Sequence, residues 1–180
     1  MTLPQEHVYT MEDLFALPDG QRAELIDGQI VNMAPPSPFH QELVMELSAA
    51  IRQHIKKNGG NCKVYPAPLA VNLHADDKTW VEPDISIICD QNKITDKACE
   101  GAPDWIIEVT SPSTQSHDYL KKLWLYRSSG VREYWIVNPV MKNVQVYFFD
   151  GEESSCQYSF GDTIPCHIFN DLTICVSNLL

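Results

Sequence analysis

The 180-residue chain has few basic residues and no long apolar run. It contains 13 Lys and Arg residues against 24 Asp and Glu residues, a formal net charge of −11 at pH 7. This balance excludes a protein that binds nucleic acid simply by being basic. The longest apolar stretches, such as residues 85–89, are far shorter than the roughly 20 residues that a membrane-spanning helix needs. The N-terminus also lacks the pattern of a signal peptide, so we expect a cytoplasmic protein without membrane association.

Several familiar catalytic and metal-binding motifs are also missing. The chain has no GxSxG, no P-loop and no GxGxxG sequence, which argues against the activities that these motifs support. It has neither a CxxC pair nor HExxH, so a zinc site is not expected. Because the six scattered cysteines would lie in a reducing compartment, we predict reduced, mostly structural thiols.

The composition that is present suits one folded domain. Hydrophobic residues make up 44% of the chain, which excludes an intrinsically disordered protein. The length lies within the range of ordinary single domains. We therefore expect a single domain over residues 1–180, with its core at about 40–138.

Hydrophobic periodicity predicts both helices and strands. Apolar residues repeat every three or four positions over residues 40–57, which predicts an amphipathic helix. Asp27-Gly28 between two apolar segments predicts a hairpin. Further strands are expected at 62–65, 69–73, 80–89, 105–109, 133–137 and 144–149, with a helix at 118–129 and a loop at 90–103. A helix between strands indicates a crossover, and hence a mixed sheet in an α/β or α+β fold with hairpins at both ends.

Acidic residues inside apolar strands are the first candidates for chemistry. Asp84 precedes the apolar segment 85–88, Glu108 lies in 105–109, and Glu24 lies in 23–26. An ionised carboxylate in such surroundings is costly unless it is paired or binds a metal. Each acid is either a strand-end residue facing solvent, a member of a salt bridge or a metal ligand. Two convergent carboxylates would suit Mg²⁺ or Mn²⁺, which prefer oxygen ligands.

Two basic residues could join these acids. Asp118, Lys122 and Tyr126 recur every four residues and therefore share one side of a helix. Lys122 either forms a solvated pair with Asp118 or turns towards the Glu108 strand, where an ammonium would stabilise a developing anion. His40 is a proton carrier, a ligand or merely the residue with which the long helix begins.

Several sequence blocks resemble the Uma2 family of bacterial proteins. These blocks are Glu24-Leu25-Ile26-Asp27-Gly28, Ser37-Pro38-Phe39-His40-Gln41, Val81-Glu82-Pro83-Asp84-Ile85, residues 103–114, Lys122-Leu123-Trp124-Leu125-Tyr126 and residues 130–137. They stand in one order over residues 11–149. The family is grouped with restriction-endonuclease-like folds of the PD-(D/E)XK class.

The resemblance implies a restriction-endonuclease-like core, with a mixed sheet flanked by helices, and a metal-dependent phosphodiesterase centre. Asp84 and Glu108 are then the acids of the two half-motifs, and they would hold the metal with a backbone carbonyl near Val109. The superfamily lysine would stand at position 110, where this chain has Thr110. The resemblance therefore points to Lys122 on the following helix. Glu24 and His40 match family positions near the same centre.

The resemblance predicts a Mg²⁺- or Mn²⁺-dependent endonuclease that acts on nucleic acid, DNA rather than RNA. Two other readings stay open: a non-catalytic interaction protein that keeps the fold, and a metal-dependent hydrolase of another substrate. Edge strands and the apolar segment 147–149 favour a homodimer. The acidity does not exclude a nuclease, because residues 118–132 carry four basic residues and one acid.

Overall fold

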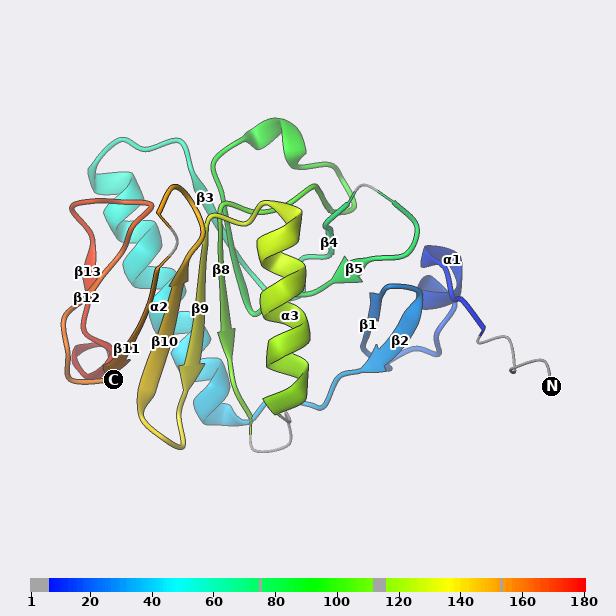
Figure 1. Ribbon diagram of the computed structural model, residues 1–180, viewed down its shortest axis with the longest axis horizontal. Helices are drawn as coiled ribbons and strands as arrows, with labels where there is room; N and C mark the ends of the chain where they lie inside the picture. The colour runs from blue at the N-terminus through cyan, green and yellow to red at the C-terminus, as the bar shows by residue number, and fades with distance from the viewer. Residues whose placement is uncertain (1–6, 75, 112–115, 153) are drawn as a thin grey trace.

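The computed structural model describes residues 7–74, 76–111, 116–152 and 154–180, and gives only the backbone of 116–118. Parts of the N-terminal segment and of the predicted loop before the second long helix therefore lie outside the described residues. Two sheets and two long helices dominate the fold (Figure 1).

The larger sheet is mixed, as the sequence predicted. Six of the described strands form it in the order β11-β10-β9-β8-β6-β3. Strands β8 and β9 run parallel, and all other neighbours are antiparallel. The bounds are Lys63–Pro66 for β3, Ile85–Ile88 for β6, Trp105–Val109 for β8, Glu133–Asn138 for β9, Asn143–Phe148 for β10 and Ser154–Ser159 for β11.

The two long helices lie on opposite faces of this sheet (Figure 1). Helix α2 (Pro38–Lys57) begins two residues before the predicted start, because Pro38 is favourable at the first helical position and Ser37 caps the helix. The Ser37 hydroxyl oxygen accepts a hydrogen bond from the His40 N–H at 3.2 Å. Helix α3 (Ser116–Ser129) forms the crossover between β8 and β9. Each helix buries its apolar side against the sheet.

A smaller sheet carries the N-terminal hairpin. Its order is β2-β1-β5-β4-β7, with β1 at Ala23–Ile26, β2 at Gln29–Asn32, β4 at Val71–Asn72, β5 at Trp80–Val81 and β7 at Cys99–Glu100. Asp27 and Gly28 both have positive φ, at 50° and 74°, as the tight turn between two antiparallel strands requires. The predicted hairpin is confirmed, and a short helix α1 (Met11–Phe15) precedes it.

One strand prediction and one loop prediction need correction. The segment 80–89 was expected to form one strand, but it contributes β5 and β6 to different sheets. Pro83 stands between them and has no N–H to donate to a ladder. This break places Asp84 directly before β6, at the junction of the two sheets. The predicted loop 90–103 also contains β7 and a short 3₁₀ helix, η1 (Gln91–Lys93).

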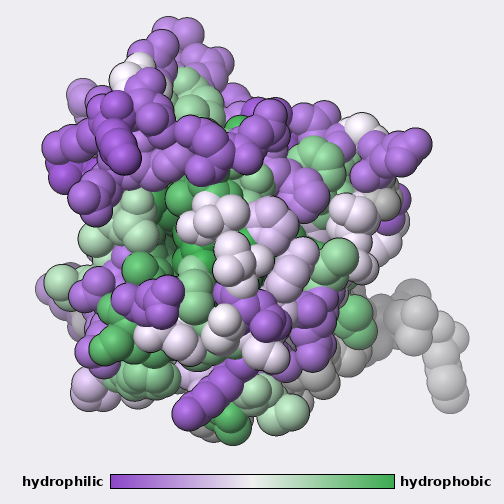
Figure 2. Space-filling view, turned by 90° about the vertical axis from the view of Figure 1, so that its left-hand side faces the viewer, coloured by the Kyte–Doolittle hydropathy of each residue, from purple (hydrophilic) through white to green (hydrophobic). Residues whose placement is uncertain are grey.

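The C-terminal segment forms a second hairpin, as expected. Strands β12 (Ile164–Pro165) and β13 (Thr173–Ile174) pair antiparallel, and a 3₁₀ helix, η2 (Val176–Asn178), follows. The segment covers the α2 side of the larger sheet, where Ile164, Ile174 and Val176 are buried. Figure 2 looks onto the left-hand side of Figure 1, where the C-terminal segment lies, and shows hydrophobic residues in a recess beneath a hydrophilic rim.

The prediction of reduced thiols is wrong for one pair of cysteines. Cys62 and Cys89 form a disulfide, whereas Cys99, Cys156, Cys166 and Cys175 are free. Lys63 pairs with Ile88 in the antiparallel ladder, so the next residues outward, Cys62 and Cys89, face each other. Positions 27 residues apart in the sequence come together only through this register.

No helix within the described ranges is long and apolar enough to cross a membrane.

A buried carboxylate, that of Glu133, joins β9 to the C-terminal segment. Glu133 is 0% exposed. Its Oε1 accepts from Trp135 Nε1 at 2.7 Å, and its Oε2 accepts from the backbone N–H groups of His167 and Ile168 at 3.0 and 2.9 Å. Three N–H donors therefore satisfy one buried acid, which carries the two acceptor oxygens that this arrangement requires.

Glu133→Gln should lower the free energy of unfolding by about 1–3 kcal/mol. The glutamine side chain has an NH₂ group in place of one carboxylate oxygen. This NH₂ group would face N–H donors that now bond to that oxygen, and donors cannot bond to donors. Urea denaturation measures the loss, with Glu152→Gln, an exposed site, as the matched control. Equal stability of Glu133→Gln and the parent would contradict the conclusion that the Glu133 carboxylate joins β9 to the C-terminal segment.

The disulfide makes a separate prediction. Denatured protein should show four reactive thiols before reduction and six after it, since the chain has six cysteines and four of them are free. A thiol titration with a chromogenic disulfide reagent counts them. Six reactive thiols in unreduced protein would show that Cys62 and Cys89 are not joined.

Candidate active site

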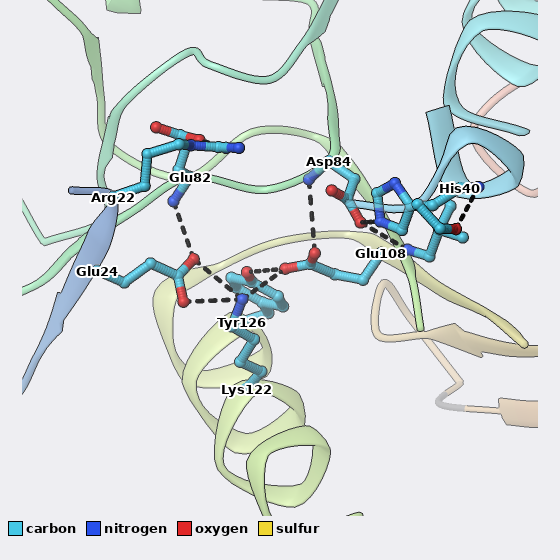
Figure 3. A network of polar contacts seen from close by, with 10 residues as sticks. Arg22, Glu24, His40, Glu82, Asp84, Glu108, Lys122 and Tyr126 are labelled. Atoms are coloured by element: carbon cyan, nitrogen blue, oxygen red, sulfur yellow. Dashed lines mark hydrogen bonds and ion pairs between the residues drawn. The ribbon is translucent and has the colours of Figure 1, made fainter. Parts of the chain in front are cut away.

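The fold brings three acids together from two sheets. Asp84 precedes β6 and Glu108 lies in β8, and these strands are neighbours with Ile85 opposite Ile107. Glu24 comes from β1 of the smaller sheet, and its Oε1 accepts from the Glu82 backbone N–H at 3.0 Å. All three predicted acids therefore face one centre (Figure 3).

Lys122 lies between two of these acids. Its ammonium donates to Glu108 Oε1 and to Glu24 Oε1, each at 2.9 Å, and it lies 2.9 Å from Glu24 Oε2 (Figure 3). One helical turn later, Tyr126 donates its hydroxyl to Glu108 Oε1 at 2.8 Å. The α3 side that carries Lys122 thus turns inward, and of the two alternatives left open for this lysine the turn towards the Glu108 strand is realised. The Asp118 side chain lies outside the described residues.

Asp84 is fixed on its other side. Its Oδ2 accepts from the Val109 N–H at 2.8 Å and lies 3.1 Å from His40 Nε2. Within the described part of the chain, Asp84 Oδ1 accepts no hydrogen bond, and Glu108 Oε2 has one long contact of 3.5 Å with the Asp84 N–H. One oxygen of each acid is therefore left for a ligand.

Burial and mutual charge shift the protonation of this cluster. Burial raises the pKa of Glu108 to about 7, and the negative charges of Asp84 and Glu24 add to the effect while Lys122 opposes it. For Lys122, burial lowers the pKa, but Glu108 and Glu24 outweigh it, so the pKa is raised and the ammonium stays charged. For His40, burial also lowers the pKa, but Asp84 outweighs it with help from the Val109 backbone, and the pKa is raised.

The cluster lies in the wall of a groove of about 930 Å³. Helix α3 forms one side of the groove, and the β1–β2 hairpin with the segment before α2 forms the other. The lining includes Glu24, His40, Asp84, Glu108, Val109 and Lys122. The predicted site residues therefore share an opening that is large enough for a ligand.

Some residues of this site were not assigned a role from the sequence. Tyr126 was recognised only as sharing a helix side with Lys122, although that four-residue spacing is the signal that places its hydroxyl on Glu108. Arg22 pairs with Glu82 beside the groove, and no local motif marks this pair, because the partners are 60 residues apart in the sequence. Thr110 is buried and its N–H donates to the Val137 carbonyl. Position 110 therefore extends the hydrogen bonding between β8 and β9.

The oxygen donors of this site could supply part of the ligand shell of a hard divalent cation. Asp84 and Glu108 each offer a carboxylate oxygen, and the Val109 backbone lies beside them. Among the described residues, no three His, Cys, Asp or Glu side chains form a complete metal site. Mg²⁺ typically keeps several waters and uses one or two carboxylates, so the residues present fit such an ion.

Comparison with known proteins agrees with this architecture. A crystal structure described as "a putative nuclease belonging to DUF820" from Anabaena variabilis superposes with a TM-score of 0.74 at 22% identity, over 94% of this chain and 96% of that one. The similarity shows the fold, and the predicted restriction-endonuclease-like core is confirmed.

Two relatives are known as uncharacterized proteins of Synechocystis. The protein slr1290 is 26% identical over 147 residues, 80% of this chain and 76% of the relative. The protein sll1609 is 26% identical over 130 residues, 71% of this chain and 72% of the relative. The profile of the Uma2 family, described as "putative restriction endonuclease", matches residues 11–177. Because this match spans nearly the whole sequence, the chain belongs to the Uma2 family.

Proposed function

We propose that the protein is a metal-dependent endonuclease that hydrolyses phosphodiester bonds in nucleic acid. One observation carries the proposal: Asp84 and Glu108 lie side by side in the groove wall, each with an oxygen left for a ligand, and a partly buried lysine contacts one of them. Phosphodiester hydrolysis needs charge stabilisation where anionic oxygens gather. The family and the fold of the Anabaena structure support a nuclease.

Mg²⁺ or Mn²⁺ would be held by the carboxylates of Asp84 and Glu108 and the carbonyl of Val109. When bound, such an ion polarises the phosphate and lowers the pKa of a coordinated water. The chain itself prepares this position. The Val109 N–H and His40 hold Asp84 Oδ2, and Lys122 and Tyr126 hold Glu108 Oε1. These contacts fix the orientation of both carboxylates and leave Asp84 Oδ1 and Glu108 Oε2 for the ion.

Lys122 has the charge that a phosphate oxygen requires. Its ammonium stays protonated because its pKa is raised. The hydrogen bond to Glu24 fixes the ammonium in the groove wall. We assign Lys122 the stabilisation of the developing negative charge, or the orientation of the attacking water, and Glu24 the positioning of Lys122. His40 orients Asp84 through Nε2 and lines the groove, and we assign it the role of a proton carrier.

The preference for DNA over RNA, a cytoplasmic location and a homodimer remain predictions. Strand β11 is one of the two outer strands of the larger sheet, and most of its residues are exposed. An exposed edge of this kind offers N–H and C=O groups for pairing with a second copy. Sedimentation of the full chain measures this state.

The first prediction concerns cleavage. Asp84→Asn, Glu108→Gln and Lys122→Met should each lower metal-dependent cleavage of DNA by roughly 100-fold or more, because each removes a ligand or the stabilising charge. Cleavage of labelled single-stranded and duplex DNA with Mg²⁺ or Mn²⁺ is the measurement. Glu46→Gln, an exposed acid on α2, is the matched control and should keep the parental rate.

Absence of cleavage by the parent with either metal on every nucleic acid tested would contradict the proposal and favour a non-catalytic protein of the same fold. Equal cleavage by the parent and all three variants would show that this cluster is not the active site.

The second prediction concerns pH. The pKa of Glu108 is raised from 4.5 to about 7 in the folded protein, so without metal its contribution to stability is lost as pH rises across that window. A metal binds the ionised carboxylate and therefore competes with the proton. The rise in Tm caused by Mn²⁺ should grow from about pH 6 to about pH 8.

Thermal denaturation with and without Mn²⁺ checks this dependence. Glu108→Gln lacks the titrating group and should show a small Mn²⁺ effect at both pH values. A Mn²⁺ effect in the parent that is independent of pH, or that falls as pH rises, would rule out Glu108 as a ligand that must lose a proton.

A further inference from the structure

Trp124 on α3 is a large aromatic side chain exposed to solvent. Its exposure is 72%. All four tryptophans of the chain lie in the described ranges, and the other three are buried, with exposures of 6% for Trp80 and 0% for Trp105 and Trp135. Burying the Trp124 ring against a ligand would remove a large apolar area from water.

Trp124 stands where two grooves meet. It lines the candidate active-site groove, and with Ser128 it also lines a neighbouring groove of about 520 Å³. The second groove is further lined by Arg127, Arg132 and Phe149. A flexible chain that leaves the first groove along α3 would therefore pass over the Trp124 ring before it reaches the second.

The surface around Trp124 is basic, although the protein is acidic. Residues 119–132 contain four Lys or Arg residues and no acid. Lys122 is held between Glu24 and Glu108 and adds no unbalanced charge to the surface, whereas Arg127 is exposed and lines the second groove. Lys121 is exposed, lines the first groove and forms no ion pair with another described residue. Arg132 forms ion pairs with Asp104 and Asp150, so its positive charge is already balanced.

We propose that Trp124 is a stacking platform for an unpaired base of a single-stranded nucleic acid that runs from the active-site groove towards the second groove. The inference rests on the proposed nuclease function and narrows its substrate to nucleic acid with a single-stranded segment. Base faces are hidden within a duplex but open in a single strand, where aromatic side chains stack on them and basic groups track the backbone.

A second copy of the chain is the rival occupant, because Leu120 lies one turn from Trp124 and is 66% exposed. A symmetric contact through this side of α3 would bring the exposed Lys121 side chains of the two copies towards each other, and like charges repel. Nucleic acid carries the opposite charge. The charge on this side of α3 therefore favours a nucleic acid strand.

Intrinsic fluorescence tests the proposal without turnover. In an Asp84→Asn background with Mg²⁺, single-stranded oligothymidylate should quench tryptophan emission, because Trp124 is exposed and the other three tryptophans are buried. A blunt duplex of the same length should quench little. Adding Trp124→Ala should weaken oligothymidylate binding roughly 10-fold, as measured by anisotropy of a labelled strand, and Trp124→Phe should restore most of it.

Leu120→Ala is the matched control, because Leu120 is on the same helix and similarly exposed but lines neither groove. It should bind oligothymidylate like the parent. Unchanged affinity and unchanged quenching in Trp124→Ala would overturn the proposal. So would a lower sedimentation mass of Trp124→Ala with unchanged affinity, which would assign the residue to contact between copies.

The two proposals fail separately. Quenching and a Trp124-dependent affinity without any cleavage by the parent would leave the stacking site intact and contradict the nuclease function. Metal-dependent cleavage of single strands by Trp124→Ala, with parental affinity and rate, would support the nuclease and overturn the stacking site.

Discussion

The partly buried ammonium of Lys122 between Glu24 and Glu108 is the interaction on which the site depends. It joins α3, the smaller sheet and the larger sheet at one point. An unpaired buried charge would be strongly destabilising, whereas a paired one fixes the geometry of its partners. The cluster still holds three carboxylates, those of Glu24, Asp84 and Glu108, against one lysine and a histidine. This excess of negative charge is what a divalent cation would offset.

Much of this arrangement could be predicted from the sequence, because the signals are local. Acids beside apolar strands are costly and therefore conspicuous, which singled out Glu24, Asp84 and Glu108. The four-residue spacing from Lys122 to Tyr126 placed both on one side of a helix. The helix and strand order then predicted a mixed sheet, and the register of β6, β8 and β9 brings Asp84 and Glu108 together.

The remaining features depend on contacts between distant segments. The Cys62–Cys89 disulfide follows from the register of β3 and β6, and thiol spacing alone does not reveal a register. The break at Pro83 divides one apolar segment between two sheets, a topology that periodicity cannot distinguish from a continuous strand. The grooves on either side of Trp124 arise only when α3 packs beside other elements, so a tryptophan in a helical pattern reads as an ordinary apolar residue.

The net charge of −11 takes on a structural meaning here. Three of the acids belong to the cluster around Lys122, and a divalent ion would offset part of their charge, while the exposed Lys121 and Arg127 of α3 lie nearby in the sequence. The most direct test of the account is a crystal soaked with Mn²⁺, located by its anomalous scattering. The account predicts one ion within roughly 2.0–2.6 Å of oxygens from both Asp84 and Glu108. Well-ordered carboxylates with no ion between them at saturating Mn²⁺, or an ion bound elsewhere, would contradict it.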